Sequence, residues 1–472
     1  MLVDDAPTTP PAAAPRGTTT RLLGVALGYF MVLLDMTVLA VAEPDLARSL
    51  HPSTSGLQWA ITAYTVTFAA ALLSAGAAAD RFGARRVFTV GVLAFGLGSL
   101  ACAGAPNLGA LVALRAALGV AAALCAPASM AMIADLYPDP ARRARAVSVW
   151  AAVSGAAVAA GPVLGGVLVA LGGWRLVFLA NVPLAVLTCL LVHGPGVARR
   201  RPPRTGPAPV SGAPSGSVAR RRSAWAVQLA AVAALALGTD AVIAFGAGQV
   251  VHGTCSLAGA AVAAVALVLL DGRSGAPLLV RGPGLAPALV TGGAVNAALA
   301  GVLFVVPLVL ARDTALSPLG IGLAFLPMTV PFAVNPLLTG RLVARHGPRP
   351  PLVLGLALLV AGALALALTV RGGALDRTPA FAVLLGSLVA LGLGTSFALP
   401  SLVALVIGVA PPGTAGRASG LLSAVRQLGA SVGVALAGAF VVDAPATGLA
   451  ALAALCAAAL VLLAATRPRS AT

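Results

Sequence analysis

The sequence contains no lysine, a single glutamate and few charged residues of any kind. Charged residues make up 9% of the chain, against about 25% in an ordinary soluble domain. Without lysine, Schiff-base chemistry and a Walker phosphate-binding loop are excluded. The five cysteines lie singly in apolar runs and the four histidines are scattered, so we expect no disulfide framework, no metal site and no cofactor. No nucleophile stands beside a plausible base, so we do not expect an enzyme.

Apolar residues dominate what is present. They form 59% of the 472 residues, and the mean hydropathy is +1.01, which leaves too little polar material for the surface of a soluble fold. The net charge of +17 rests on thirty arginines that alternate with long apolar runs. This interleaving is typical of membrane topology rather than of nucleic-acid binding. We therefore expect an integral membrane protein in contact with the lipid bilayer and without a nucleic-acid partner.

Apolar windows of about 20 residues, the length that spans a bilayer, recur fourteen times. They fall at 22–42, 57–79, 87–105, 108–134, 144–171, 174–194, 224–245, 250–270, 285–311, 318–340, 350–370, 379–408, 418–442 and 445–465. The pattern predicts an all-α, polytopic membrane protein with fourteen transmembrane helices.

The placement of arginine predicts the orientation of these helices. With the N-terminus inside, 23 arginines fall in cytoplasmic segments, 5 in outer segments and 2 within spans. The positive-inside rule requires such an asymmetry, and one miscounted span would disturb it downstream. We therefore expect a multi-pass protein of the cell membrane with both termini in the cytoplasm.

An internal repeat divides the chain into two halves. Gly76, Arg81, Gly83 and Arg85 recur as Gly340, Arg345, Gly347 and Arg349, each 264 residues later. Paired halves that move around a central site are typical of secondary transporters. We predict a cytoplasmic tail at 1–21, six-helix bundles at 22–194 and 285–465, a cytoplasmic linker at 195–223, an inserted helix pair at 224–270 and a cytoplasmic tail at 466–472.

The first copy of the repeated loop, which we call the gating loop, combines two glycines with four charged residues. The six residues are Gly76, Asp80, Arg81, Gly83, Arg85 and Arg86. Glycines permit a tight turn between helices, and a carboxylate in the turn can cap the next helix or pair with an arginine. We expect a cytoplasmic gating latch, asymmetric because Ala344 replaces the aspartate in the second copy.

Ionisable residues inside the apolar spans are rare and therefore informative. Asp35 lies in the first span, about 12 Å from its outer end, and Arg115 lies about 10 Å from the outer end of the fourth. Their similar depth allows the two charges to compensate each other. The only glutamate, Glu43, follows near the outer membrane edge; it lies either at the interface or in an outer vestibule.

The fifth span combines five residues that favour close helix approach and a kink. They are Gly155, Gly161, Pro162, Gly165 and Gly166. Gly161 and Gly165 form a small-residue face, and a proline inside a helix frees a backbone carbonyl.

Together these motifs resemble the major facilitator superfamily, in particular its fourteen-span drug:proton antiporters of the QacA/EmrB and methylenomycin-resistance type. The resemblance runs over residues 21–463. It implies proton or cationic-substrate binding by Asp35, proton coupling by Arg115 with Gly119, and an antiporter motif from Gly155 to Gly166. Ala40 and Glu43 depart from the pattern that follows the aspartate of the first span.

Two further residues are candidates for the transport site. Arg426, in a weaker match to the thirteenth span, either contacts substrate or extends towards the cytoplasm. Asp240 lies about 9 Å below the outer face in the inserted pair. A carboxyl group buried without a partner binds a proton near neutral pH, so we rank Asp35 first and Asp240 second as proton carriers.

The sequence thus predicts a secondary active transporter that exports hydrophobic drug-like or antibiotic-like compounds in exchange for protons by alternating access. We expect a monomer whose partners are a small hydrophobic substrate and protons. The alternatives are a major-facilitator transporter of a polar metabolite and a transport-inactive membrane sensor.

Overall fold

A computed structural model describes residues 18–193, 230, 233–234, 236–245, 248–273, 284–372, 375, 377–411 and 415–466. These residues are helical apart from short turns and loops, so the prediction of an all-α fold is confirmed for them. Among these residues, ten helices are long and apolar enough to cross a membrane, or eleven if the bent α2 counts as one span. The predicted linker at 195–223 and nearly all of the two tails lie outside the described residues.

The first bundle contains seven helices. They are α1 (Thr18–Leu50), α2 (Thr54–Phe82), α3 (Ala84–Ala103), α4 (Leu108–Leu136), α5 (Pro140–Gly172), α6 (Trp174–Leu179) and α7 (Asn181–His193). The most extensive packing joins α2 to α4, α1 to α5 and α3 to α4. Ser53, Asn107 and Asp139 cap the starts of α2, α4 and α5 by accepting backbone N–H groups, which satisfies donors that the first turn leaves free.

The second bundle repeats this arrangement with one broken span. Its helices are α10 (Leu285–Asp313), α11 (Pro318–Ala324), α12 (Leu326–Val334), α13 (Pro336–His346), α14 (Arg349–Gly372), α15 (Thr378–Val409), α16 (Ala415–Gly438) and α17 (Pro445–Ala465). The single helix expected at 318–340 is interrupted at Phe325 and Asn335. Pro327 and Pro336 stand just after these two breaks, where their missing N–H groups are tolerated.

The repeated loop has the same backbone in both halves. Gly83 has a φ of 90° and donates its N–H to the carbonyl of Ala79, whereas Gly347 has a φ of 78° and donates to Val343. The donors and the acceptors are each 264 residues apart. A positive φ favours glycine because it has no Cβ, so the sequence repeat reflects a repeated turn.

The inserted helices are short in the part of the chain that the structure describes. Ala236–Phe245 and the first part of α9 (Val250–Arg273) are apolar but shorter than a full span. They pack on each other, with Phe245 against Gly253 and Leu237 against Gly259. Among the described residues, α9 makes no extensive contact with either bundle. Fourteen spans are therefore not established.

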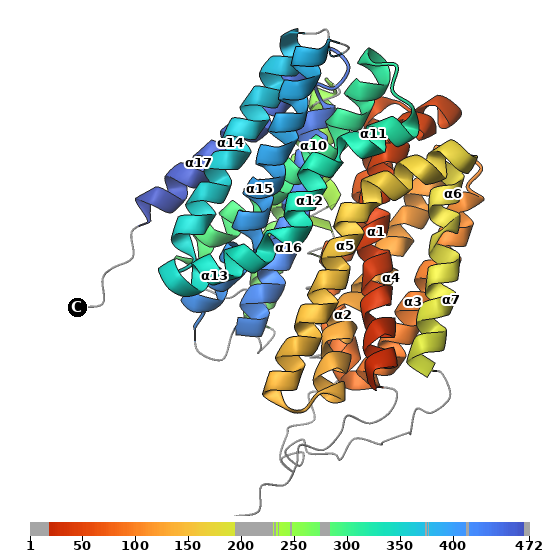
Figure 1. Cartoon of the computed structure of the whole chain (residues 1–472), viewed down its shortest axis with the longest axis vertical. Helices are drawn as coiled ribbons and strands as arrows, with labels where there is room; N and C mark the ends of the chain where they lie inside the picture. Colours follow the sequence, from red (N-terminus) through yellow and green to blue (C-terminus); the bar gives the residue numbers. More distant parts are fainter. Residues whose placement is uncertain are drawn as a thin grey trace, which may run out of the picture.

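The two bundles meet at one end of the molecule. We call the end that carries Arg81, Gly83 and Arg345 the basic end, and the other the opposite end. In Figure 1 the first bundle runs from red to yellow and the second from green to blue, with α11 leaning over α5 at the opposite end. Contacts of α5 with α11 and of α2 with α16 join the bundles.

Candidate functional site

A buried ion pair lies inside the first bundle. The guanidinium of Arg115 on α4 contacts the carboxylate of Asp35 on α1, and the two side chains are 2% and 0% exposed. Arg115 Nε also donates to the backbone carbonyl of Ala60, at 3.1 Å. Asn181 Nδ2 donates to the second carboxylate oxygen, at 3.0 Å. The depths inferred from the sequence thus correctly place Asp35 and Arg115 together; their role in coupling stays a prediction.

Two polar side chains complete this cluster and were not identified as functional from the sequence. Asn181 also donates to Ser99 Oγ on α3, at 3.2 Å, which fixes its amide between two helices. The ring of Tyr64 lies 4.6 Å from the guanidinium carbon of Arg115 and its hydroxyl donates to the carbonyl of Val32. A cation over an aromatic face is stabilised electrostatically. The sequence signal that could have identified Asn181 and Tyr64 is that each is a polar residue within an apolar span.

The partners of Asp35 change the expectation drawn from the sequence. The expected proton carrier was a carboxyl group buried without a partner, whereas Asp35 faces a cation and an amide donor. Removing one member of a buried pair leaves an uncompensated charge. Protonation of Asp35 would therefore act on Arg115, and the pair has to be considered as one unit.

Asp240 also differs from the expectation of an unpartnered buried acid. Its side chain is 24% exposed and lies 2.8 Å from Nε2 of His252. The hydroxyl of Ser256 donates to the same carboxylate oxygen, at 2.6 Å. Both partners belong to α9, so Asp240 joins the two inserted helices to each other, and in the part of the chain that the structure describes no hydrogen bond or ion pair links it to the Asp35 cluster.

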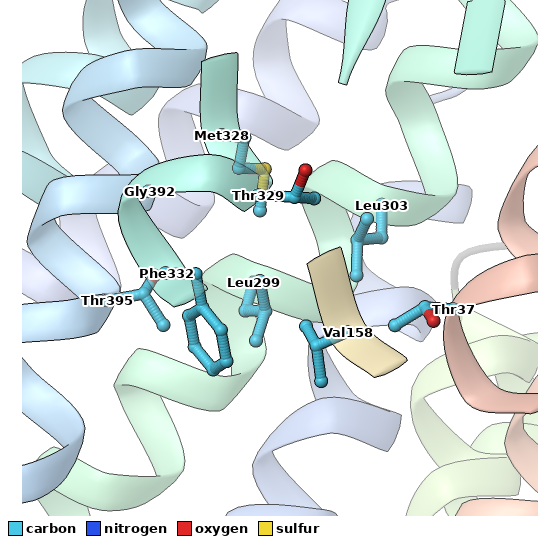
Figure 2. A pocket seen from close by; sticks show the side chains of 9 residues that line it. All are labelled: Thr37, Val158, Leu299, Leu303, Met328, Thr329, Phe332, Gly392 and Thr395. Atoms are coloured by element: carbon cyan, nitrogen blue, oxygen red, sulfur yellow. The ribbon is translucent and has the colours of Figure 1, made fainter. Parts of the chain in front are cut away.

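A small cavity lies between the two bundles (Figure 2). Its lining residues come from α1, α5, α10, α12 and α15, and they are Thr37, Val158, Leu299, Leu303, Met328, Thr329, Phe332, Gly392 and Thr395. The lining is apolar except for three threonines, and the free space of about 10 Å³ is close to the minimum for one water molecule. A larger ligand requires the bundles to separate here.

Four of the five motif residues on α5 lie at helix contacts. A Cβ at Gly161 would lie 1.9 Å from Thr37 Oγ1, and one at Gly165 would lie 2.7 Å from the carbonyl of Val38. Both glycines therefore permit close packing of α5 on α1, as predicted. Gly166 instead faces α11 of the second bundle, and Gly155 has no neighbour within 4 Å. Pro162 exposes its carbonyl to α11.

Among the described residues, no hydrogen bond or ion pair joins the gating loop to the second bundle. Asp80 and Arg81 are exposed, and Arg81 stacks on the adjacent Phe82 at 5.0 Å. Arg85 donates to the carbonyl of Val192 at the end of α7, which holds the loop to its own bundle. The predicted latch between halves is therefore not engaged in this conformation.

Arg426 lies on α16, near the first bundle. Its Nε donates to Oδ1 of Asn296 on α10, at 3.2 Å, and its charge lies close enough to Tyr29 on α1 to interact with it. Tyr29 in turn stacks on Trp150 of α5, with ring centroids 4.7 Å apart. Arg426 is thus hydrogen-bonded within the second bundle, on the side that approaches Tyr29 of the first.

Comparison with known proteins gives a consistent assignment. The profile of the Major Facilitator Superfamily matches residues 25–308 and 288–472. The multidrug resistance protein Stp of Mycobacterium tuberculosis is 32% identical over 88% of this chain and 74% of its own length. The methylenomycin A resistance protein of Streptomyces coelicolor is 32% identical, covering 89% and 84%. The tetracenomycin C resistance and export protein of Streptomyces glaucescens is 31% identical, covering 91% and 77%.

Solved structures agree with the fold. A POT family transporter in complex with 5-aminolevulinic acid superposes with a TM-score of 0.73 over 97% of both chains, at 12% sequence identity. A bacterial homologue of the human lysosomal transporter Spinster, in an inward-facing and unoccupied conformation, gives a TM-score of 0.63 at 17% identity over 96% and 95% of the chains. At these identities the likeness concerns the fold alone.

Proposed function

Because this chain belongs to the Major Facilitator Superfamily, we propose that it exports hydrophobic drug-like or antibiotic-like compounds in exchange for protons. Export of such compounds follows from several relatives that carry drug or antibiotic resistance in their names. The family makes the chain a membrane transporter rather than an enzyme. Proton exchange rests on the residues of the site.

One observation carries this proposal: α1 contributes to both the apolar cavity and the buried ion pair. Thr37 lines the cavity between the bundles, whereas Asp35, two residues earlier, pairs with Arg115 inside the first bundle. Two residues in a helix differ by about 200° in direction, so the two groups lie on opposite sides of α1. Protonation of Asp35 weakens the pair and allows α1 to shift at the cavity wall.

The conformation supports alternating access with the basic end towards the cytoplasm. Gln58 on α2 donates to the carbonyl of Ala435 on α16, at 2.9 Å, and Thr65 bonds to Ser431, at 2.9 Å. Both links join the bundles in the part of these helices nearest the opposite end. In this orientation the described state is closed to the outside, and the gating loop with Asp80 and Arg81 engages only when the basic end closes.

We further propose that the inserted helix pair lies beside the two bundles and that the functional unit is a monomer. The pair packs on itself through Asp240, His252 and Ser256. With two six-span bundles, this pair would complete the fourteen-span topology. The apolar lining of the cavity favours hydrophobic substrates over the polar metabolites that other members of the superfamily carry.

Transport by purified protein in proteoliposomes tests the proposal. An imposed pH gradient should drive accumulation of hydrophobic fluorescent compounds, with substrate-dependent proton movement in the opposite direction. Amino acids and sugars should not move. Movement of polar solutes alone, or substrate movement without proton movement, would contradict the proposal. Asp313→Asn, which changes an exposed acid paired with Arg312, provides a control for loss of a carboxylate away from the site.

A further inference from the structure

Glu43, the only glutamate of the chain, is buried. Its residue is 2% exposed, and its Oε2 atom has no hydrogen-bond partner. The sequence leaves open an interfacial position or one in an outer vestibule, and in the structure the carboxyl group is buried. Asp35, the other buried acid on α1, differs because an arginine and an asparagine contact it.

The neighbouring acid on α1 faces the other way. Asp45 accepts the backbone N–H of Trp174 at 2.9 Å and pairs with Arg48 at 3.3 Å. Glu43 lies two residues earlier, about 200° around the helix. It is therefore directed away from the junction with α6, and these partners of Asp45 are not available to it.

The charged groups around α1 do not compensate Glu43. In the halves of the packed helices nearest the opposite end, the titratable and charged side chains are Tyr64, Arg115, Arg175, Arg312 and Asp313. Arg115 pairs with Asp35, Arg175 stacks on Trp174, and Arg312 pairs with Asp313. Among the described residues, no salt bridge reaches Glu43.

Glu43 lies at the depth where the two bundles close. It is seven residues from the end of α1, or about 10 Å along the axis. Gln58 is four residues from the start of α2, or about 6 Å, and its amide joins α16. An ionised carboxylate without a partner is strongly disfavoured in such a dry site, so closure of this end requires a neutral Glu43.

We propose that Glu43 is a second proton-binding site, occupied while the opposite end is closed and emptied when that end opens. The proton comes from water at the opposite end and returns to it as the bundles part, so this site gates the conformational change. The proposal rests on the proposed function because it assumes that the opposite end opens and closes during transport. It assigns to Glu43 a role separate from that of Asp35.

The closed state can be held covalently to test this. A Cβ at position 438 would lie 2.8 Å from Gln58 Cγ, which brings the two Cβ atoms within about 4.5 Å, the span of a disulfide. Gln58→Cys and Gly438→Cys, in a background with the five native cysteines replaced, should therefore form a reversible lock. Because the chain has one glutamate, cell-free synthesis with side-chain ¹³C-labelled glutamate gives a single labelled carboxyl group.

The ¹³C chemical shift then reports the protonation state of Glu43 directly. In the oxidised, locked protein it should remain that of a neutral carboxyl group at neutral pH, and reduction should allow ionisation. An ionised Glu43 in the locked protein at neutral pH would overturn the proposal. The measurement needs no substitution of Glu43, so it does not depend on the folding of a variant.

A second measurement tests the gating. The thiolate chemistry of disulfide formation depends on pH in every variant, so the rate in the protein with Glu43 is divided by the rate in Glu43→Gln at the same pH. This ratio should rise as the pH falls, because protonation of Glu43 favours the closed state. A ratio that does not change with pH would contradict the proposal. Transport assays separate this proposal from the proposed function. If Glu43 is neutral in the locked protein but the reduced protein does not export drugs, only the proposed function is rejected. If the reduced protein exports drugs but Glu43 is ionised in the locked protein, only the gating role of Glu43 is rejected.

Discussion

Gly166 on α5 and Gly322 on α11 pack reciprocally across the two bundles. A Cβ at Gly166 would lie 2.5 Å from the carbonyl oxygen of Pro318, and one at Gly322 would lie 2.4 Å from that of Pro162. Each glycine thus leaves room for a backbone carbonyl of the other helix. Backbone cannot move aside as a flexible side chain can, so closure of the opposite end depends on both glycines.

Gly166→Ala should therefore favour the conformation that is open at the opposite end. Overpacking in a fitted contact costs about 1–3 kcal/mol, which corresponds to roughly a 5- to 150-fold shift in the conformational equilibrium. The rate of disulfide formation between cysteines at positions 58 and 438 measures the closed population. We expect this rate to fall in Gly166→Ala, together with the rate of export.

Gly155→Ala provides the matched control on the same helix. No atom lies within 4 Å of a Cβ at this position, so disulfide formation and export should both remain at wild-type levels. Equal effects of the two substitutions would indicate a general effect on α5 and would reject the role of Gly166 in closure.

A second prediction concerns the gating loop. Asp80 is exposed here and its loop is hydrogen-bonded to the first bundle, so its bonds with the second bundle should form when the basic end closes. Asp80→Asn should slow export of every substrate by a similar factor, measured as kcat across a compound panel. Asp313→Asn at the opposite end serves as the control. Altered ratios between substrates at an unchanged rate would contradict a latch.

The sequence predicted those features that depend on one helix or one repeat. Counting residues along two antiparallel helices placed Asp35 and Arg115 at one depth, and the repeat of Gly83 at Gly347 indicated a turn that recurs in both halves. Such inferences succeed because rise per residue and backbone conformation are local properties.

The missed features depend on which helices become neighbours. Gln58 bonds to α16 across 377 residues of sequence, and Asp240 bonds to His252 and Ser256 in the next helix. Neither contact follows from apolar periodicity, because the periodicity does not specify a partner. Glu43 was expected at the membrane interface or in an outer vestibule, whereas the packed helices leave it only 2% exposed.

A third prediction follows from the partners of Asp240. Asp240→Asn should reduce proton-coupled export only slightly, because the carboxylate is partly exposed and its bonds serve the inserted pair. Substrate-driven proton flux in proteoliposomes measures the effect. A loss as large as that of Asp35→Asn would show that the inserted pair takes part in coupling and would contradict its peripheral placement.

A fourth prediction concerns the cavity. Phe332 contributes the largest apolar side chain to the lining, and burial of such a group is worth about 1.5–3 kcal/mol. Phe332→Ala should raise KM for bulky apolar substrates by roughly tenfold or more, with a smaller effect on kcat. Phe245→Ala, in the inserted pair, is the control. Equal changes for both variants would argue against substrate binding in this cavity.

The last prediction separates the coupling role of the Asp35–Arg115 pair from its structural role. Asp35→Asn leaves the Arg115 guanidinium without its charged partner in a site where both side chains are almost fully buried. Breaking a buried pair in this way costs about 3–5 kcal/mol, so thermal unfolding in detergent should occur at a lower temperature. Asp35→Asn combined with Arg115→Gln removes both charges and should recover part of this stability.

Proton-coupled export should be lost in the single and the double variant alike, since neither retains the carboxylate. If the double variant regained substrate-driven proton flux along with its stability, the pair would serve the fold alone and the proton would bind elsewhere. Normal flux in the folded Asp35→Asn protein would exclude the carboxylate as the coupling group even if the protein were destabilised.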